Sequence, residues 1–151
     1  MEDRLATRND ISAVLRNASE RTRGEMKVAD VTHRDVMLEF RAAMKRREIR
    51  SLIHEGEAVA LLAWDRGAFE DGVEYLSTSF IGIEKFFQPN VPSVRFGGRL
   101  LRRLQRQAGN IMIVSQCYSD HPKVQRWYEL MGYEMYDQDE TSKSFVLHRR
   151  T

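Results

Sequence analysis

Two adjacent glycines, Gly97 and Gly98, stand at the beginning of a leucine-rich segment whose spacing predicts a helix over 98–108. The start of a helix offers backbone N–H groups that have no partner within the helix, together with the positive end of the helix dipole. Glycines at such a start let the backbone approach a phosphate group closely. The same pair also permits plain close packing of the helix start. The sequence therefore indicates either a phosphate site or a packing contact at this point.

Arginines follow the glycine pair at helical spacing, so that their guanidinium groups share one face of the predicted helix, opposite its leucines. They are Arg99, Arg102, Arg103 and Arg106. Such a strip can meet the phosphates of a cofactor, a nucleic acid or an acidic partner protein. Charged side chains opposite an apolar stripe more often form a solvated helix face, and we favour that interpretation.

The histidines and the single cysteine form no pattern typical of a metal site or a thiol nucleophile. No two of the four histidines share metal-ligand spacing on one predicted element, so we expect no metal. They are His33, His54, His121 and His148. His121 is expected to support the cap of a helix. Cys117 has no histidine and acid near it in the sequence, and we expect it to be half-buried at a strand end.

The composition is typical of one soluble domain. The 151 residues are 42% apolar and 30% charged, with 24 basic and 22 acidic side chains and a formal charge of +2. A chain of this size buries roughly 68–70% of the surface that it exposes when unfolded, which is enough for a core without disulfides. The longest strictly apolar run, 58–64, is far shorter than the roughly 20 residues of a membrane helix. We therefore expect a soluble cytoplasmic protein, and the near-zero net charge argues against nucleic acid as a partner.

Polar residues mark the first elements of the chain. A short strand near Leu5–Thr7 precedes a helix that Asn9 and Asp10 are expected to cap. Thr32 and Asp35 have the spacing of a capping box and predict the start of a second helix. The first third of the chain is therefore expected to contain one strand and two helices.

The remaining sequence alternates strands with helices. It comprises a hairpin of 49–54 and 58–64, a strand within 73–83, the helix 98–108, a strand over 111–114, a helix capped by Ser119 or Asp120 and stopped at Gly132, and a final hairpin of 133–136 and 144–148. This order predicts an α/β fold, with a mixed central sheet of about six to seven strands flanked by about four helices. We expect a single domain over 1–151.

The helix before Gly132 carries the motif of a known family. Its sequence over 124–133, VQRWYELMGY, contains a tyrosine, three further residues and then Gly-Tyr. Together with the element order, this motif resembles the GNAT acyltransferases, which use acetyl-CoA. The resemblance implies a GNAT-like fold, and it implies that the Tyr128 hydroxyl protonates the departing CoA thiolate, a role that a phenol of pKa near 10 can fill. The alternative is that Tyr128 is an amphipathic packing residue.

The glycine pair also matches this family. The segment from Val94 to Leu101 resembles the pyrophosphate loop that leads into a helix, with Gly97 at the last glycine position. Ser93 and Arg95 stand where family members carry the earlier glycines. The resemblance implies acetyl-CoA as the cofactor, bound by residues of the preceding strand and of this segment. These residues are Ile81, Ile83, Arg95, Phe96, Gly97, Gly98 and Arg99.

The resemblance further implies a general base on the strand within 73–83. Glu74 lies at the strand start, where several family members carry a glutamate that accepts the amine proton directly or through water. Glu84, at the far end of the strand, is the alternative. A carboxylate base needs burial to raise its pKa towards neutrality. Either residue can instead be a solvated edge residue.

A second, looser resemblance is to small GNAT-like proteins of short-tailed phages, some of them acetyltransferases and some internal virion proteins. It rests on the segments 23–25, 78–87 and 126–133. Because one fold can serve several functions, two hypotheses follow. The first is an acetyl-CoA-dependent N-acetyltransferase that transfers the acetyl group directly to an amine. The second is a GNAT-fold structural or interaction protein that contacts partner subunits in a homo-oligomer or a virion, located in the host cytoplasm or the virion.

Overall fold

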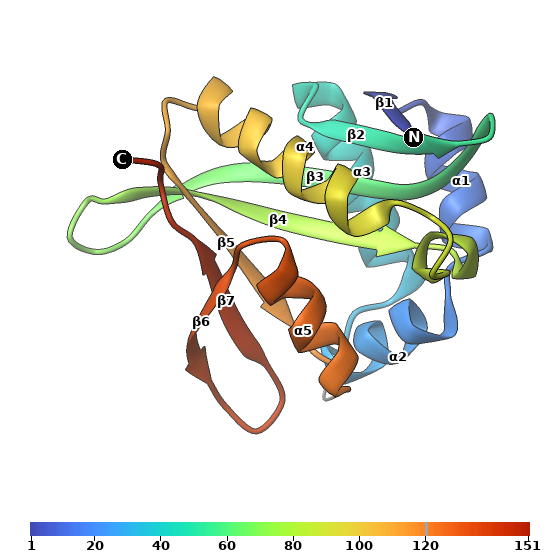
Figure 1. Ribbon diagram of the computed structural model, residues 1–151. Helices are drawn as coiled ribbons and strands as arrows, with labels where there is room; N and C mark the ends of the chain where they lie inside the picture. Colours follow the sequence, from blue (N-terminus) through green and yellow to red (C-terminus); the bar gives the residue numbers. More distant parts are fainter. Residues whose placement is uncertain (120) are drawn as a thin grey trace. The chain divides into compact units, whose positions relative to one another are not determined.

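The computed structural model describes residues 1–119 and 121–151 (Figure 1). In chain order its elements are β1 (Glu2–Leu5), α1 (Arg8–Arg16), α2 (Glu20–Val28), α3 (His33–Arg46), β2 (Ile49–His54), β3 (Glu57–Ala68), β4 (Glu74–Gly82), the 3-10 helix η1 (Glu84–Phe87), α4 (Ser93–Gln107), β5 (Met112–Cys117), α5 (Pro122–Leu130), β6 (Glu134–Gln138) and β7 (Lys143–Leu147). The predicted α/β class is confirmed, and the described residues contain one α-helix more than expected.

The strands form one mixed sheet in the order β1-β2-β3-β4-β5-β7-β6. β1 and β2, β2 and β3, β5 and β7, and β7 and β6 pair antiparallel, whereas β4 and β5 run parallel with Leu76 opposite Ile113. A parallel pair needs a crossover connection, and α4 lies in that connection. The mixed sheet expected from the element order is confirmed.

By its internal contacts the chain divides into two compact units. The first comprises Met1–Trp64 and Ser79–Ser93, and the second comprises Asp65–Thr78 and Val94–Thr151. The strands β3 and β4 each contribute residues to both units. Among the predicted site residues, Ile81, Ile83 and the alternative base Glu84 belong to the first unit and the others to the second.

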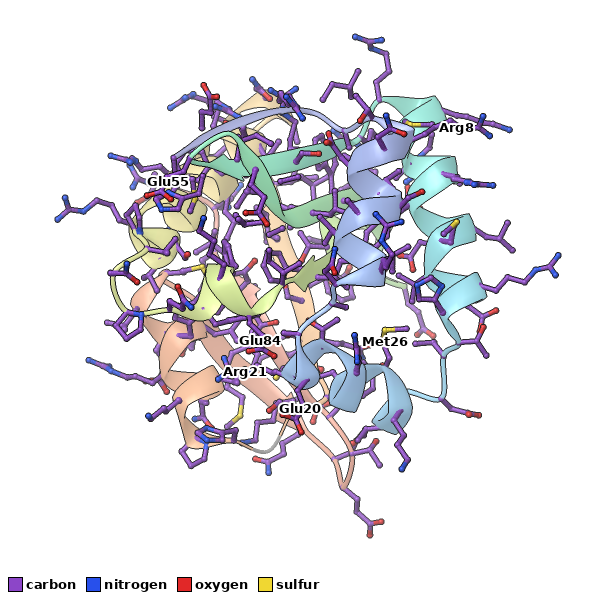
Figure 2. The ribbon with its side chains drawn as sticks, turned by 90° about the vertical axis from the view of Figure 1, so that its right-hand side faces the viewer. Arg8, Glu20, Arg21, Met26, Glu55 and Glu84 are labelled. Atoms are coloured by element: carbon purple, nitrogen blue, oxygen red, sulfur yellow. The ribbon has the colours of Figure 1, made fainter. Side chains whose placement is uncertain are left out.

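In the first unit, α1 and α3 lie side by side (Figure 2). Helix α1 begins earlier than predicted, because its N-cap is Thr7 rather than Asn9 or Asp10. The Thr7 hydroxyl accepts a hydrogen bond from the Asp10 N–H group, and the Asp10 carboxylate accepts one from the Thr7 N–H group. This reciprocal pair is a capping box, the same arrangement that was predicted and is confirmed for Thr32 and Asp35 at the start of α3.

Helix α2 is the element that the sequence did not predict. Thr22 is its one buried residue, so the helix has no apolar stripe from which a period could be recognised. Polar contacts hold its start instead. The Ser19 N–H group and the Thr22 hydroxyl both donate to the carbonyl oxygen of Gly82 at the end of β4, and the Ser19 hydroxyl accepts from the Thr22 N–H group.

The second unit packs α4 and α5 with β5, β6 and β7. Its buried core side chains are Leu76, Leu100, Leu101, Leu104, Ile113, Cys117, Val124, Tyr133, Phe145, Val146 and Leu147. The predicted stop at Gly132 is confirmed, since Gly132 has a φ of 103° directly after the end of α5. Cys117 lies at the end of β5 as expected, but it is fully buried rather than half-buried, with 1% of its surface exposed.

Candidate active site

Helix α4 begins at Ser93, five residues before its predicted start at Gly98. The Ser93 hydroxyl donates a hydrogen bond of 2.5 Å to the carbonyl oxygen of Phe86, which fixes the chain where the helix begins. The segment predicted to be a pyrophosphate loop is therefore helical, and this corrects the sequence analysis. The N–H groups available at the helix start belong to the first turn, around Val94 and Arg95, and this turn contains no acidic side chain.

The glycine pair lies inside α4 and allows a close contact with α5. A Cβ atom at Gly97 would lie 3.3 Å from the sulfur of Met131, and one at Gly98 would lie 3.9 Å from the Met131 carbonyl oxygen. Met131 is the residue that ends α5. Glycine within a helix costs roughly 1 kcal/mol relative to alanine, and the close approach of Met131 offsets part of this cost at Gly97 but not at Gly98. Of the two roles left open by the sequence, the structure contains the packing contact.

The Tyr128 side chain is held between two aromatic rings. It stacks on Phe145 of β7, with ring centroids 4.4 Å apart and an interplanar angle of 6°, and it meets Tyr133 edge-on at 5.3 Å. The Tyr128 carbonyl oxygen also accepts hydrogen bonds from the N–H groups of Met131 and Tyr133. Aromatic packing and the turn after α5 together fix the direction of this half-buried side chain.

Beside Tyr128 lies a network of three hydroxyl groups. The Tyr133 hydroxyl is 3.0 Å from the Ser115 hydroxyl, which is 2.6 Å from the hydroxyl of Thr78. The network joins β4, β5 and the turn after α5. Burial raises the pKa of Tyr133 to about 12, and its hydrogen bonds with Ser115 and Thr78 offset the effect of burial only in part. Tyr133 therefore stays protonated throughout the range in which the protein would work.

The start of α5 depends on His121, which is its N-cap. The His121 Nδ1 atom accepts a hydrogen bond from the Lys123 N–H group, and the His121 N–H group donates to the Ser119 hydroxyl. The expectation that His121 supports a cap is confirmed, whereas Ser119, a predicted cap, lies two residues before the observed N-cap. Asp120, the other predicted cap, lies outside the described residues.

The two candidate bases are exposed and occupied by other contacts. Glu74 at the start of β4 forms a 2.7 Å ion pair with Arg66, whose guanidinium also donates to the carbonyl oxygen of Ala108. Glu84 accepts a 2.7 Å hydrogen bond from the Glu20 N–H group at the start of α2; Figure 2 shows Glu20 and Glu84 close together. Neither carboxylate has the burial that a general base near neutral pH requires.

The strand residues predicted to bind the cofactor are buried in the first unit. The side chains of Ile81 and Ile83 are 5% and 8% exposed, so any contact with a cofactor would use their main-chain groups. The Ile83 N–H group already donates to the carbonyl oxygen of Val59, and the Ile83 carbonyl oxygen accepts from Phe86. Ile83 therefore has no main-chain donor to offer, which leaves Ile81 as the candidate on this strand.

Comparison with known proteins identifies the fold. No protein-family model matches the sequence, and no curated protein sequence matches it. A GNAT-family acetyltransferase from Streptococcus agalactiae is 15% identical over 99% of this chain and 96% of its own, with a TM-score of 0.68. YncA from Salmonella typhimurium, solved with its cofactor acetyl-CoA, is 12% identical over 96% and 91%, with a TM-score of 0.67. PaiA N-acetyltransferase from Thermoplasma acidophilum, in complex with coenzyme A, is 8% identical over 99% and 98%, with a TM-score of 0.68.

This chain has the GNAT fold. The resemblance inferred from the Tyr-x-x-x-Gly-Tyr motif is thereby confirmed at the level of architecture. Among the described residues, no helix of this GNAT fold is long and apolar enough to span a membrane. No three His, Cys, Asp or Glu side chains in the same residues are placed to hold a metal ion.

Sequence reasoning missed Thr78 and Ser115 in this GNAT fold. Both are hydroxyl residues within strands that also bury apolar side chains. A polar residue within such a strand was the signal that could have pointed to them. The Tyr133 hydroxyl was also missed, because the motif assigns a chemical role to Tyr128 and none to the hydroxyl of its second tyrosine. The Tyr133 phenol adds a third hydroxyl to the pair that Thr78 and Ser115 form.

Proposed function

We propose that this protein is an N-acetyltransferase that transfers the acetyl group of acetyl-CoA directly to an amine. The observation that carries the proposal is the near-full-length structural similarity to GNAT proteins, two of which were solved with acetyl-CoA or coenzyme A. The position of Tyr128, three residues before Gly-Tyr at the end of α5, supports the same conclusion.

The start of α4 fits the phosphate groups of such a cofactor. Its first turn contains no acidic side chain, and its N–H groups lie at the positive end of the helix dipole. Arg95 and Arg99 are exposed on this helix, and neither forms an ion pair with any residue that the structure describes. These residues would hold the pyrophosphate by charge and by backbone donors, whereas Gly97 and Gly98 serve the contact with α5.

The chain's own contribution to the chemistry would come from Tyr128. Acetyl-CoA, when bound, supplies an acetyl group activated as a thioester. The Tyr128 phenol is assigned to donate its proton to the departing sulfur. Because Phe145 and Tyr133 fix its ring, the hydroxyl is oriented before the substrates bind. Glu74 is exposed and paired with Arg66, so we assign removal of the amine proton to bulk water instead.

Calorimetric titration with acetyl-CoA tests the cofactor, and release of free CoA thiol with a panel of amines tests the transfer. We expect saturable binding to the wild-type protein. The double variant Arg95→Glu/Arg99→Glu should bind at least about tenfold more weakly, because attraction to the pyrophosphate becomes repulsion. Arg8→Glu/Arg126→Glu, a double reversal at exposed positions on α1 and α5, is the matched control and should bind normally. Absence of binding at millimolar acetyl-CoA would contradict the proposal and support a structural role for the fold.

A further inference from the structure

Positive charge is concentrated in one stretch of this chain. Residues 85–119 include six basic side chains and no acidic one, although the whole chain carries a formal charge of only +2. Five of the six are arginines on α4. The near-zero net charge therefore conceals a strong local imbalance.

The second half of α4 turns its arginines away from the core. Arg102, Arg103 and Arg106 follow one another at spacings of one and three residues, which places them on one side of the helix. Leu100 and Leu104, 2% and 4% exposed, occupy the opposite side. Arg106 is exposed, and Arg102 and Arg103 are half-buried.

The C-terminal tail adds two more arginines to the same place. The His148 carbonyl oxygen accepts hydrogen bonds of 2.9 Å from Arg102 and 3.0 Å from the buried amide of Gln105. The Asn110 side chain bonds both the N–H group and the carbonyl oxygen of Arg150. These contacts fix the tail near the end of α4; Figure 1 shows the C-terminus beside the loop that joins α4 to β5. Arg149 and Arg150 are exposed there.

We call Arg102, Arg103, Arg106, Arg149 and Arg150 the arginine surface. Burial lowers the pKa of Arg102, and the nearby positive charge of Arg150 lowers it further. Arg106, Arg149 and Arg150 have no acidic partner among residues 1–119 and 121–151. Like charges are thus held together by the backbone contacts of the tail, and an anion placed there would relieve their repulsion.

We propose that the arginine surface binds an acidic segment of a partner polypeptide. Guanidinium groups form paired hydrogen bonds with carboxylates, and all five cations of the surface are arginines. This interaction goes beyond acetyl transfer and does not depend on it.

The charge balance of the second unit favours a short acidic segment over a nucleic acid. Outside the surface, this unit has ten acidic and six basic side chains in its sequence, so the rest of the unit is net negative. A nucleic acid is a long polyanion whose phosphates would extend beyond the five arginines onto this net-negative unit and be repelled. The surface also has no aromatic side chain on which an unpaired base could stack. A polypeptide can confine its carboxylates to the few residues that face the arginines.

Fluorescence anisotropy with two labelled probes tests this proposal. One probe is a decaglutamate peptide and the other is a DNA duplex of 12 base pairs. We expect the peptide to bind at 50 mM salt, to weaken as salt is raised to 200 mM, and to bind more tightly than the duplex. Saturating acetyl-CoA should leave peptide binding unchanged, because Arg95 and Arg99 are not part of the surface.

Charge-reversal variants locate the binding site. Arg106→Glu/Arg149→Glu should weaken peptide binding about tenfold, because two attractions become two repulsions. Arg8→Glu/Arg126→Glu makes the same change in net charge at exposed positions outside the surface and should change binding less than about twofold; Figure 2 labels Arg8 on α1. The milder pair Arg106→Gln/Arg149→Gln gives the same test if the reversal disturbs the end of α4.

Four results would overturn the proposal. They are no peptide binding at 50 mM salt, tighter binding of the duplex than of the peptide, equal losses in the two reversal variants, and displacement of the peptide by acetyl-CoA. The last would make the surface part of the cofactor site. Because peptide binding is measured without any amine or acetyl transfer, its failure is separate from a failure of the proposed enzyme activity.

Discussion

Each of the two compact units buries a polar network around an ionisable side chain, and these two networks are built on opposite principles. In the first unit the Asp10 carboxylate accepts hydrogen bonds from Arg4, Ser51 and the Thr7 N–H group. In the second unit the network of Tyr133, Ser115 and Thr78 consists of neutral hydroxyls. One network holds a buried charge by surrounding it with donors, and the other avoids charge altogether.

The difference teaches where each unit can tolerate change. Burial by itself raises the pKa of Asp10, but the hydrogen bonds from Arg4, Ser51 and Thr7 prevail and hold it below its ordinary value. Such a network is strong only while every donor finds its acceptor. The hydroxyl network is a chain with Ser115 in the middle, so removing the hydroxyl at either end leaves the other two paired. We therefore expect the loss of one member to lower the free energy of unfolding more in the charged network than in the neutral one. The neutral network lies beside Tyr128, but losing the Tyr133 hydroxyl should change the rate of acetyl transfer little.

The largest expected effect is on the charged network. Asp10→Ala should destabilise the protein by about 3 kcal/mol, because it removes a carboxylate that accepts several hydrogen bonds and leaves the buried Ser51 hydroxyl without its acceptor. Urea unfolding measures the loss. Asp35→Ala removes the same capping-box position from α3 at an exposed site and should cost clearly less. Equal losses would show that helix capping, rather than the buried network, explains the contribution of Asp10.

The next effect separates the two tyrosines that lie side by side. If Tyr128 is the proton donor, Tyr128→Phe should lower kcat by about 100-fold with little change in KM for acetyl-CoA, since general acid catalysis contributes at least that factor. Tyr133→Phe should keep kcat within a few-fold and cost about 1 kcal/mol of stability, because Ser115 and Thr78 still pair with each other. Steady-state kinetics and urea unfolding of both variants give the comparison. A larger loss of kcat in Tyr133→Phe would reverse the two roles.

The two networks should lose their contributions to stability at opposite ends of the pH range. The pKa of Asp10 is lowered on folding, so its contribution is present above the unfolded value of about 3.9 and is lost as the pH falls below it. The pKa of Tyr133 is raised to about 12, so its contribution is present below about pH 10 and is lost as the pH rises towards 12. In urea unfolding across pH, Asp10→Ala should approach the wild type at the acid end and Tyr133→Phe at the alkaline end. A constant difference between variant and wild type across either window would contradict the assignment for that residue.

The smallest effect concerns the contact between α4 and α5. A Cβ at Gly98 would have only ordinary contacts with Met131, so Gly98→Ala should raise stability by about 0.5–1 kcal/mol through better helix propensity. Acetyl-CoA affinity should stay unchanged. Gly97→Ala is the paired comparison, and its gain should be smaller because its Cβ would approach the Met131 sulfur to 3.3 Å. A loss of acetyl-CoA affinity in a stable Gly98→Ala protein would show that the glycine serves the phosphate rather than the helix contact.

Much of the architecture could be predicted because local signals and long-range packing agree. The hairpin strand Ile49–His54 has its predicted bounds, and the capping box of Thr32 and the stop at Gly132 are found where their residue types predict them. Helix α2 could not be predicted in this way, since its start is held by polar contacts with Gly82, more than 50 residues away in the sequence. The start of α4 was placed too late because the glycines suggested a loop, whereas the contact with Met131 allows them to be helical.

The candidate site was predictable only to the extent that one motif carries it. Tyr128 could be singled out from the tyrosine and Gly-Tyr spacing, and its catalytic role stays a prediction. The partners Ser115 and Thr78 could not be singled out, because their hydrogen bonds join residues that are far apart in the sequence. A hydroxyl residue in a strand does not by itself indicate which groups it will meet. The ion pair that occupies Glu74 could likewise not be predicted. Its partner Arg66 lies on β3, and only the fold brings it to Glu74 on β4, across the loop that connects the two strands.

Because of the way α2 is attached, we expect it to unfold locally at a lower free energy than the rest of its unit. A helix that buries one polar side chain, and that is anchored at its first turn through Ser19, Thr22 and Glu84, gains little from the apolar core. Its amide protons should therefore exchange with solvent through local opening, at a free energy well below that of global unfolding, while those of α1 remain protected. Helix α2 thus forms a small cooperative unit of its own, which can open and close on β4 while the protein stays folded.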